Sequence, residues 1–142
     1  MTNRWITPIV ATLAVAASLA PSAARAAPGS DEWTPADWVE EETIELGTTE
    51  PGEDRYDFPV WLVVIDGDVY VRLGSRAAER FEESTTKPYM NVGIAGKTFS
   101  KVEGVPAPDK AGQVDELMAD KYWSDIFIRF MPHPLTLRLE PR

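Results

Sequence analysis

The most constraining feature of this sequence is a pair of β-forming runs separated by the dipeptide Asp66-Gly67. Val60–Ile65 and Val69–Leu73 are rich in valine and aromatic residues, which favour strands. Asp-Gly between two such runs predicts a tight hairpin turn, because glycine adopts the positive φ that this turn needs. The first run is apolar on both faces and therefore predicts a central strand. The second run places a charge, Arg72, inside a β context.

Alternating apolar and polar residues predict further strands. Thr43–Gly47 and Leu135–Leu139 each predict one strand, near opposite ends of the folded region. Tyr89–Ala95 and Thr98–Val105 predict a second hairpin that closes near Gly96-Lys97.

Three short helices are predicted between these strands. The first starts at Pro35 with Thr34 as its N-cap, and its early turns carry acidic residues that suit the helix dipole. The acidic residues concerned are Asp37, Glu40, Glu41 and Glu42. Trp33 and Trp38 bracket this helix, and we expect both to pack onto the domain.

The second predicted helix is Ser75–Ser84 and the third is Asp109–Trp123. The residues expected to face inward are Ala77, Ala78 and Phe81 in the second helix, and Val114, Leu117 and Met118 in the third. Ile126–Met131 fits either a strand or a helix. About six strands in antiparallel hairpins with inserted helices predict a mainly β fold, a small barrel.

The N-terminus predicts a signal peptide over residues 1–26. Arg4 provides a short positive region, and an apolar stretch follows that is shorter than the roughly 20 residues of a membrane helix. Ala24-Arg25-Ala26 fits the cleavage pattern, with a cut after Ala26 or Ala27. An uncleaved anchor is the alternative.

The predicted organisation is therefore a signal peptide, a linker over residues 27–33 and one domain over residues 34–142. Export would place this domain in the periplasm or outside the cell. Removal of the signal peptide takes away Arg4 and Arg25 from 14 basic residues and none of the 23 acidic ones, which leaves a net charge of 12 minus 23, or −11. A chain with this negative charge repels nucleic acid and anionic lipid. We therefore expect neither nucleic-acid binding nor stable membrane insertion after cleavage.

Few residues carry recognisable chemistry. The chain has no cysteine and a single histidine, His133, so it predicts neither a transition-metal site nor a nucleophile–histidine pair for hydrolysis. Glu50–Asp57 lacks the dense oxygen ligands of calcium loops and predicts a solvated loop. Any catalysis would then depend on a redox cofactor.

The hairpin Pro59–Arg72 resembles the core hairpin of the FMN-binding split-barrel superfamily, which includes the pyridoxamine 5′-phosphate oxidases and the deazaflavin-dependent nitroreductases. Within it, the chain is similar to a bacterial family through Ala119–Tyr122 and the closing segment Leu135–Pro141. The resemblance covers about residues 34–142. It implies a six-stranded split β-barrel and a homodimer that holds FMN or deazaflavin between its subunits.

The resemblance also implies a set of cofactor-binding residues. Arg72 stands where relatives place a basic residue on the flavin phosphate, and Ser75 and Arg76 follow with a hydroxyl and a second guanidinium. Arginine and a helix start both suit phosphate. Trp61 is a candidate for stacking on an isoalloxazine or haem plane, although a strand tryptophan is more often part of a core. Arg80 either joins the phosphate group or pairs with Glu79 or Glu83.

Two functions follow from this interpretation. The first is an exported flavin- or deazaflavin-binding protein with possible oxidoreductase activity. The second is a non-catalytic binding or structural module that keeps the fold without flavin. Intact basic and hydroxyl groups around one pocket favour the first function, whereas salt-bridged Arg72 and Arg76 with a filled barrel interior favour the second.

Overall fold

The structure, a computed structural model, describes residues 32–122 and 132–142. The predicted signal peptide and the ambiguous segment Ile126–Met131 lie outside the described residues.

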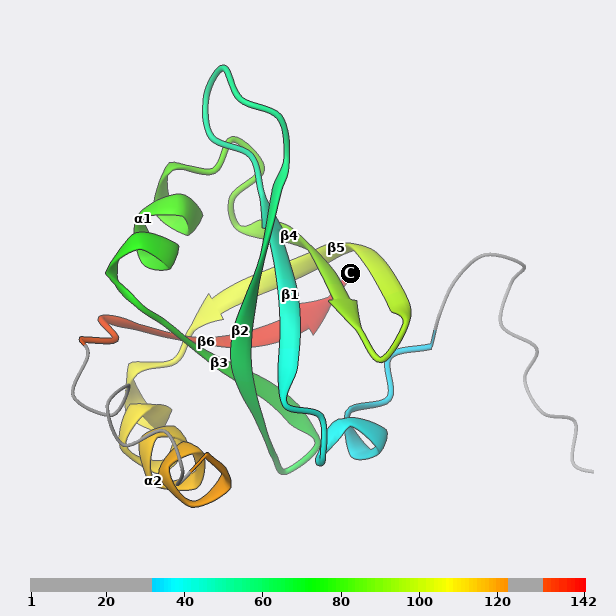
Figure 1. The fold of residues 1–142 in the computed structure, drawn as a ribbon, viewed down its shortest axis with the longest axis vertical. Coiled ribbons are helices and arrows are strands. Elements are labelled where there is room, and N and C mark those ends of the chain that lie inside the picture. Colours follow the sequence, from blue (N-terminus) through cyan, green and yellow to red (C-terminus); the bar gives the residue numbers. More distant parts are fainter. Residues whose placement is uncertain (1–31, 123–131) are drawn as a thin grey trace, which may run out of the picture.

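Six antiparallel strands form a closed barrel in the order β1-β2-β3-β6-β5-β4 (Figure 1). In chain order the strands are β1 (Thr43–Thr48), β2 (Tyr56–Ile65), β3 (Asp68–Leu73), β4 (Tyr89–Ile94), β5 (Lys97–Pro106) and β6 (Leu135–Pro141). Within the described residues, two α-helices, α1 (Ser75–Glu83) and α2 (Ala111–Lys121), lie on the outside, and the two 3-10 helices are η1 (Pro35–Trp38) and η2 (Pro108–Lys110). The predicted mainly β barrel with small helices is confirmed.

Both predicted hairpins form, and their turns have the same backbone geometry. Asp66 and Gly67 have φ values of 51° and 81°, the positive pair that matches the twist of the flanking strands. The second turn is one residue earlier than predicted, at Ala95 and Gly96, with φ values of 49° and 76°. Glycine at the second turn position makes this conformation accessible, so Lys97 already belongs to β5.

The barrel interior is packed with apolar side chains from every strand. Alternation along β2 and β3 turns Leu62, Val69 and Val71 inward, where they meet residues from β4, β5 and β6. Phe81 of α1 and Trp38 of η1 join the same cluster and are almost fully buried. Trp33 packs edge-on against Trp38 with ring centroids 4.9 Å apart, which confirms that both tryptophans pack onto the domain.

A second apolar cluster lies outside the barrel, between α2 and the outer face of β2 and β3. Val63, Ile65 and Tyr70 face α2, which contributes Val114 and Met118. Both faces of β2 are therefore covered, as the sequence predicted for a central strand. The prediction that Leu117 faces inward is wrong: it is 37% exposed. Its position lies one residue before Met118, on the part of α2 that turns towards solvent.

The first predicted helix is shorter than expected. It is the four-residue η1, without a side-chain hydrogen bond from Thr34, and Glu40–Glu42 lie beyond its end. The chain must leave the helix after burying Trp38 because β1 starts at Thr43. The backbone carbonyls of Glu41 and Glu42 instead accept hydrogen bonds from Lys121, the last residue of α2, and from Tyr122, which follows it.

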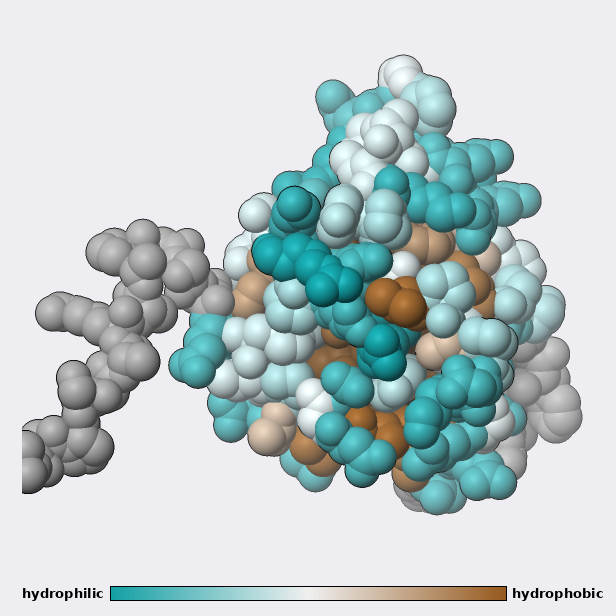
Figure 2. Space-filling view, turned by 180° about the vertical axis from the view of Figure 1, so that it is seen from behind, coloured by the Kyte–Doolittle hydropathy of each residue, from teal (hydrophilic) through white to brown (hydrophobic). Residues whose placement is uncertain are grey.

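The surface is largely hydrophilic. Figure 2 shows polar residues over most of the face turned away from Figure 1, with apolar residues only in small patches between them. The large apolar side chains exposed among the described residues are Val39, Tyr56 and Leu117, which come from three different elements or loops. Within residues 32–122 and 132–142, no helix is long and apolar enough to cross a membrane.

Gly104 of β5 tests how tightly α1 is packed on the barrel. A Cβ at this position would lie 2.9 Å from Cε2 of Phe81, so we expect Gly104→Ala to lower the free energy of unfolding by about 1–3 kcal/mol through overpacking. Gly93→Ala is the matched control, because its Cβ would meet no atom closer than 3.7 Å. Urea unfolding of both variants measures the difference. Equal stability of the two would show that Phe81 moves aside without cost.

Candidate functional site

Two of the four residues predicted to bind a cofactor share one face of the barrel. The register pairs Leu62 with Val71, so Trp61 and Arg72 are the next residues along β2 and β3. Leu62 and Val71 point into the barrel, and Trp61 and Arg72 therefore point outward, on the side that α2 covers. The hairpin thus brings an aromatic plane and a guanidinium together.

Arg72 is already paired with an acidic residue of α2. Its Nη1 lies 2.5 Å from Oδ1 of Asp115. The arginine side chain is only 17% exposed, whereas that of Asp115 is 55% exposed. The pair joins β3 to α2 across 43 residues of sequence, so no local pattern could have predicted it. A phosphate group approaching Arg72 would have to compete with this carboxylate.

Trp61 is stacked on Tyr122, the residue that follows α2. The two rings are almost parallel, with an interplanar angle of 2° and centroids 4.2 Å apart. Tyr122 therefore covers one face of Trp61. Tyr122 packs between the helix and the barrel.

Lys121 and Tyr122 also complete the hydrogen bonding of the sheet where β1 begins. The last pair between β1 and β2 is Thr43 with Trp61, so Leu62 has no β1 partner on that side. The Tyr122 hydroxyl lies 2.6 Å from the carbonyl of Glu42 and 3.0 Å from that of Leu62. The Lys121 ammonium donates to the carbonyls of Glu41 and Leu62. Two side chains thus satisfy backbone groups that a strand would otherwise bind.

This arrangement shifts the protonation of both side chains. Burial raises the pKa of Tyr122 from 10.0 to about 12, against the opposing hydrogen bond with Leu62. Burial lowers the pKa of Lys121, although Glu40, Glu41 and Glu42 act in the opposite direction. Both shifts follow from placing polar groups between a helix and a sheet.

The other two predicted residues, Ser75 and Arg76, lie at the start of α1. Both are exposed. Arg76 points to carboxylates rather than to Arg72: Nη1 lies 3.3 Å from Glu79 and Nη2 lies 3.5 Å from Glu50. The hydrogen bond with Glu79 and the charge of Glu50 raise the pKa of Arg76. The two arginines are thus held by different partners on different elements.

Two expectations about neighbouring residues are wrong. Arg80 pairs with neither Glu79 nor Glu83, but with Glu50 at 2.9 Å and Glu53 at 3.8 Å. Glu50 itself is buried, so the loop after β1 is not solvated throughout. The spacing of Arg76 and Arg80 at i and i+4 indicates a shared helix face, but Glu50 is 30 residues from Arg80 in sequence. Only the fold could show this pair.

A polar groove of about 500 Å³ lies elsewhere, on the outer face of β1 and β4. Glu45, Asp57, Arg55 and Lys97 contribute charges of both signs to it. Arg72, Ser75, Arg76 and Trp61 do not line it. His133 is half-buried just before β6, and no group of three or more metal-binding side chains gathers within the described ranges.

Comparison with solved structures supports the architecture. The heme storage protein HutZ from Vibrio cholerae superposes with a TM-score of 0.52 at 16% identity, over 75% of this chain and 87% of that protein. A protein of unknown function from Agrobacterium tumefaciens gives a TM-score of 0.54 at 16% identity, over 70% of this chain and 48% of its own. An FAD-binding protein from Mesorhizobium loti, at a TM-score of 0.47 and 15% identity over 73% and 82% of the chains, is too distant to add weight.

The chain has the FMN-binding split-barrel fold. The sequence resemblance to this superfamily is thus confirmed at the level of the fold. No family model matches the sequence, and no curated protein is significantly similar to it.

The Tyr122 hydroxyl, which bonds the backbone of Glu42 and Leu62, predicts that the free energy of unfolding depends on pH. The unfolded side chain loses its proton near its ordinary pKa of 10.0 and the folded one near 12. Between these values the folded state holds a proton that the unfolded state has lost. The stabilisation is therefore complete below pH 10 and falls as pH rises towards 12. For a half-exposed ring, screening by water reduces the effect to about 1 kcal/mol.

Tyr122→Phe keeps the stacked ring and removes the titrating hydroxyl. Urea unfolding between pH 7 and 12 should show the variant less stable at pH 7 by about 1 kcal/mol, for the lost hydrogen bond, and nearly equal to wild type at the alkaline end. Lys121 is present in both proteins, so its titration cancels. If the two proteins differed in free energy of unfolding by the same amount at every pH from 7 to 12, the assigned role of the hydroxyl would be contradicted.

Proposed function

We propose that this chain is an exported split-barrel binding protein that does not carry a flavin at Arg72. The observation that supports this most directly is the pairing of Arg72 with Asp115 at 2.5 Å. The guanidinium expected to bind the flavin phosphate already has an anionic partner within the same chain. The arginine side chain is largely buried, which strengthens its interaction with that partner relative to one in open water.

The surroundings of Arg72 support the same conclusion. Trp61, the residue expected to stack on a ring system, has its plane against Tyr122. The barrel interior is packed with apolar side chains. A flavin at this face would therefore have to displace both the Asp115 carboxylate and the Tyr122 ring.

A binding role without catalysis is compatible with this fold. HutZ, which shares the split barrel, is described as a heme storage protein. We infer that the present chain likewise binds or carries a ligand, and that its own residues supply recognition rather than a reaction.

A second candidate function is a flavin- or deazaflavin-dependent oxidoreductase. The observation that favours it is that Trp61 and Arg72 lie together on one face of the hairpin. Asp115 is more than half exposed and so is the partner that a phosphate would displace most easily. In that case Arg72, with Ser75 and Arg76, would hold the phosphate of FMN or deazaflavin, and the bound flavin would supply the redox chemistry.

Export and dimer formation remain predictions. N-terminal sequencing of the protein recovered from outside the cytoplasm would identify the cleavage site expected after Ala26 or Ala27. Light scattering of the mature chain would report the homodimer that the resemblance implies.

The first experiment is a visible absorbance spectrum of the mature protein after incubation with FMN and desalting. We expect the wild-type protein to retain no flavin, because Asp115 competes for Arg72. Asp115→Asn removes that competition and should raise the affinity for FMN about tenfold. Asp120→Asn, an exposed position on the same helix, is the charge-matched control. Flavin that is retained by wild type and lost in Arg72→Ala would overturn the proposal in favour of the oxidoreductase.

A further inference from the structure

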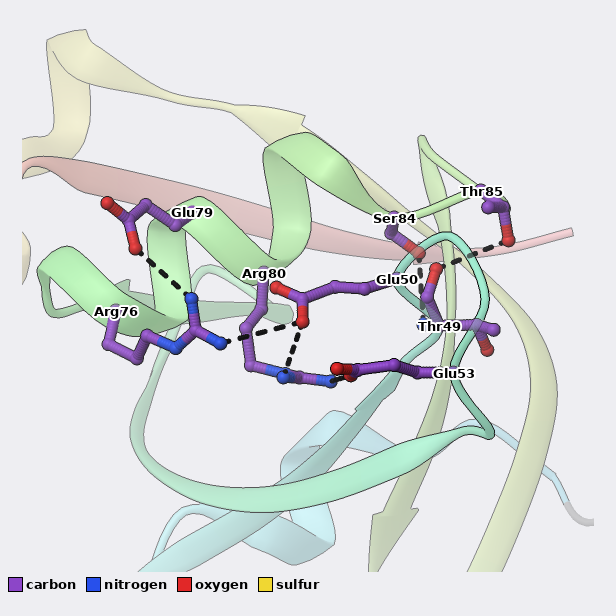
Figure 3. Close-up of polar contacts among 8 residues, drawn as sticks. All are labelled: Thr49, Glu50, Glu53, Arg76, Glu79, Arg80, Ser84 and Thr85. Carbon is purple, nitrogen blue, oxygen red and sulfur yellow. Dashed lines mark hydrogen bonds and ion pairs between the residues drawn. The ribbon is translucent and has the colours of Figure 1, made fainter.

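Arg76 and Arg80 of α1 converge on a single carboxylate. They lie one helical turn apart and point towards the loop between β1 and β2 (Figure 3). Arg80 Nη1 is 2.9 Å and Arg76 Nη2 is 3.5 Å from the same atom, Oε2 of Glu50. Two guanidinium groups that meet at one oxygen are a typical arrangement for binding an anion.

The burial of this group is unusual for charged side chains. Glu50 and Arg80 are each only 7% exposed. Among the described residues, Oε1 of Glu50 and both Nε and Nη2 of Arg80 have no hydrogen-bond partner, although they are buried. A buried ion pair repays its desolvation only when its remaining donors and acceptors are also satisfied. Glu50 is therefore an incomplete partner for the two arginines.

The unused donors indicate which ligand would fit better. A phosphate monoester has three terminal oxygens and up to two negative charges, whereas Glu50 presents one oxygen to both guanidiniums. The phosphate would accept a hydrogen bond from Nε of Arg80, and from Nη2, whose only contact is the ion pair with Glu53 at 3.8 Å. Arg76 is 67% exposed and gives the site contact with solvent. The ring of Tyr56 covers Arg80 at 4.6 Å and holds its guanidinium in place.

Glu50 lies near the start of the loop between β1 and β2, and hydrogen bonds anchor this end of the loop. Thr85 donates its backbone N–H to the carbonyl of Thr49 at 2.8 Å, and the Thr49 N–H lies 3.3 Å from the hydroxyl of Ser84. The Thr85 hydroxyl also donates to the Thr49 carbonyl, at 3.2 Å. Figure 3 shows this bond and the contact with Ser84, and together these contacts fix the residue just before Glu50. The loop after Glu50 projects from the barrel and is exposed, so Glu50 can leave the arginines without disturbing a strand.

We propose that Arg76 and Arg80 form a binding site for a phosphate monoester, and that the Glu50 carboxylate competes with the ligand for this site. Glu50 acts as an internal anion that keeps the arginines in position and limits binding to ligands that outcompete it. Glu79 lies at the exposed edge, where it disfavours ligands with extended negative charge. This site differs from the proposed flavin site in using Arg80 in place of Arg72, while Arg76 is common to both.

Calorimetric titration with inorganic phosphate at constant ionic strength tests the proposal. Glu50→Gln keeps the shape of the side chain and removes its charge, and we expect it to bind phosphate about tenfold more tightly than wild type. Glu53→Gln is the matched control, since it removes one charge from the same loop at a residue 3.8 Å from Arg80. It should stay within about twofold of wild type. Adding Arg76→Gln to Glu50→Gln should abolish the gain.

If Glu50→Gln binds phosphate no more tightly than Glu53→Gln, the proposal fails and Glu50–Arg80 is a structural ion pair. Circular dichroism first establishes that Glu50→Gln folds. If it does not, thermal unfolding of the wild type and Arg76→Gln replaces the titration. Phosphate should then raise the midpoint of the wild type and not that of the variant, and an equal response of the two would overturn the proposal. FMN is absent throughout, so the result is independent of the flavin experiment.

Discussion

Closure of the barrel is the constraint on which the rest of this structure depends. Once β1 pairs with both β2 and β4, alternate side chains of every strand are committed to an interior that apolar residues fill. A ligand is then left with the outer face, the helices and the loops. The candidate binding residues accordingly lie outside the barrel. Trp61 and Arg72 point outward from the hairpin, and Arg76 and Arg80 lie on α1, which packs on the outside.

The two helices attach to the barrel by different physical means. α2 combines apolar burial with a clamp, since Lys121 and Tyr122 bind the backbone of Leu62 where β1 has not yet begun. α1 uses Phe81 against Gly104 and the buried charges of Arg80 and Glu50. Buried charges stabilise less than apolar contacts of the same size. We therefore attribute the anchoring of α1 mainly to Phe81, and the proposed phosphate site gives the arginine cluster a separate role.

The same pairing of arginine and carboxylate occurs at both candidate sites. Asp115 holds Arg72, and Glu50 holds Arg80 and Arg76. In a chain with an excess of acidic residues, a basic side chain meets an internal anion more easily than a free one. Binding of an anionic ligand is then an exchange of one anion for another. The site on α1 is better suited to that exchange than Arg72, because some of its buried polar atoms have no hydrogen-bond partner. Arg72 is instead held by a close ion pair with the single residue Asp115.

The sequence by itself determined the strands, the Asp66-Gly67 hairpin, the amphipathic α1 and the barrel class, because these depend on the period of apolar residues and on turn chemistry within a few positions. It also indicated which arginines to consider. It did not determine the partners of Arg72, Arg80 or Tyr122, nor the burial of Glu50. Those contacts join residues 30 to 80 positions apart. Only the closed barrel brings them together, since the free energy of such a contact depends on burial and geometry that no local pattern carries.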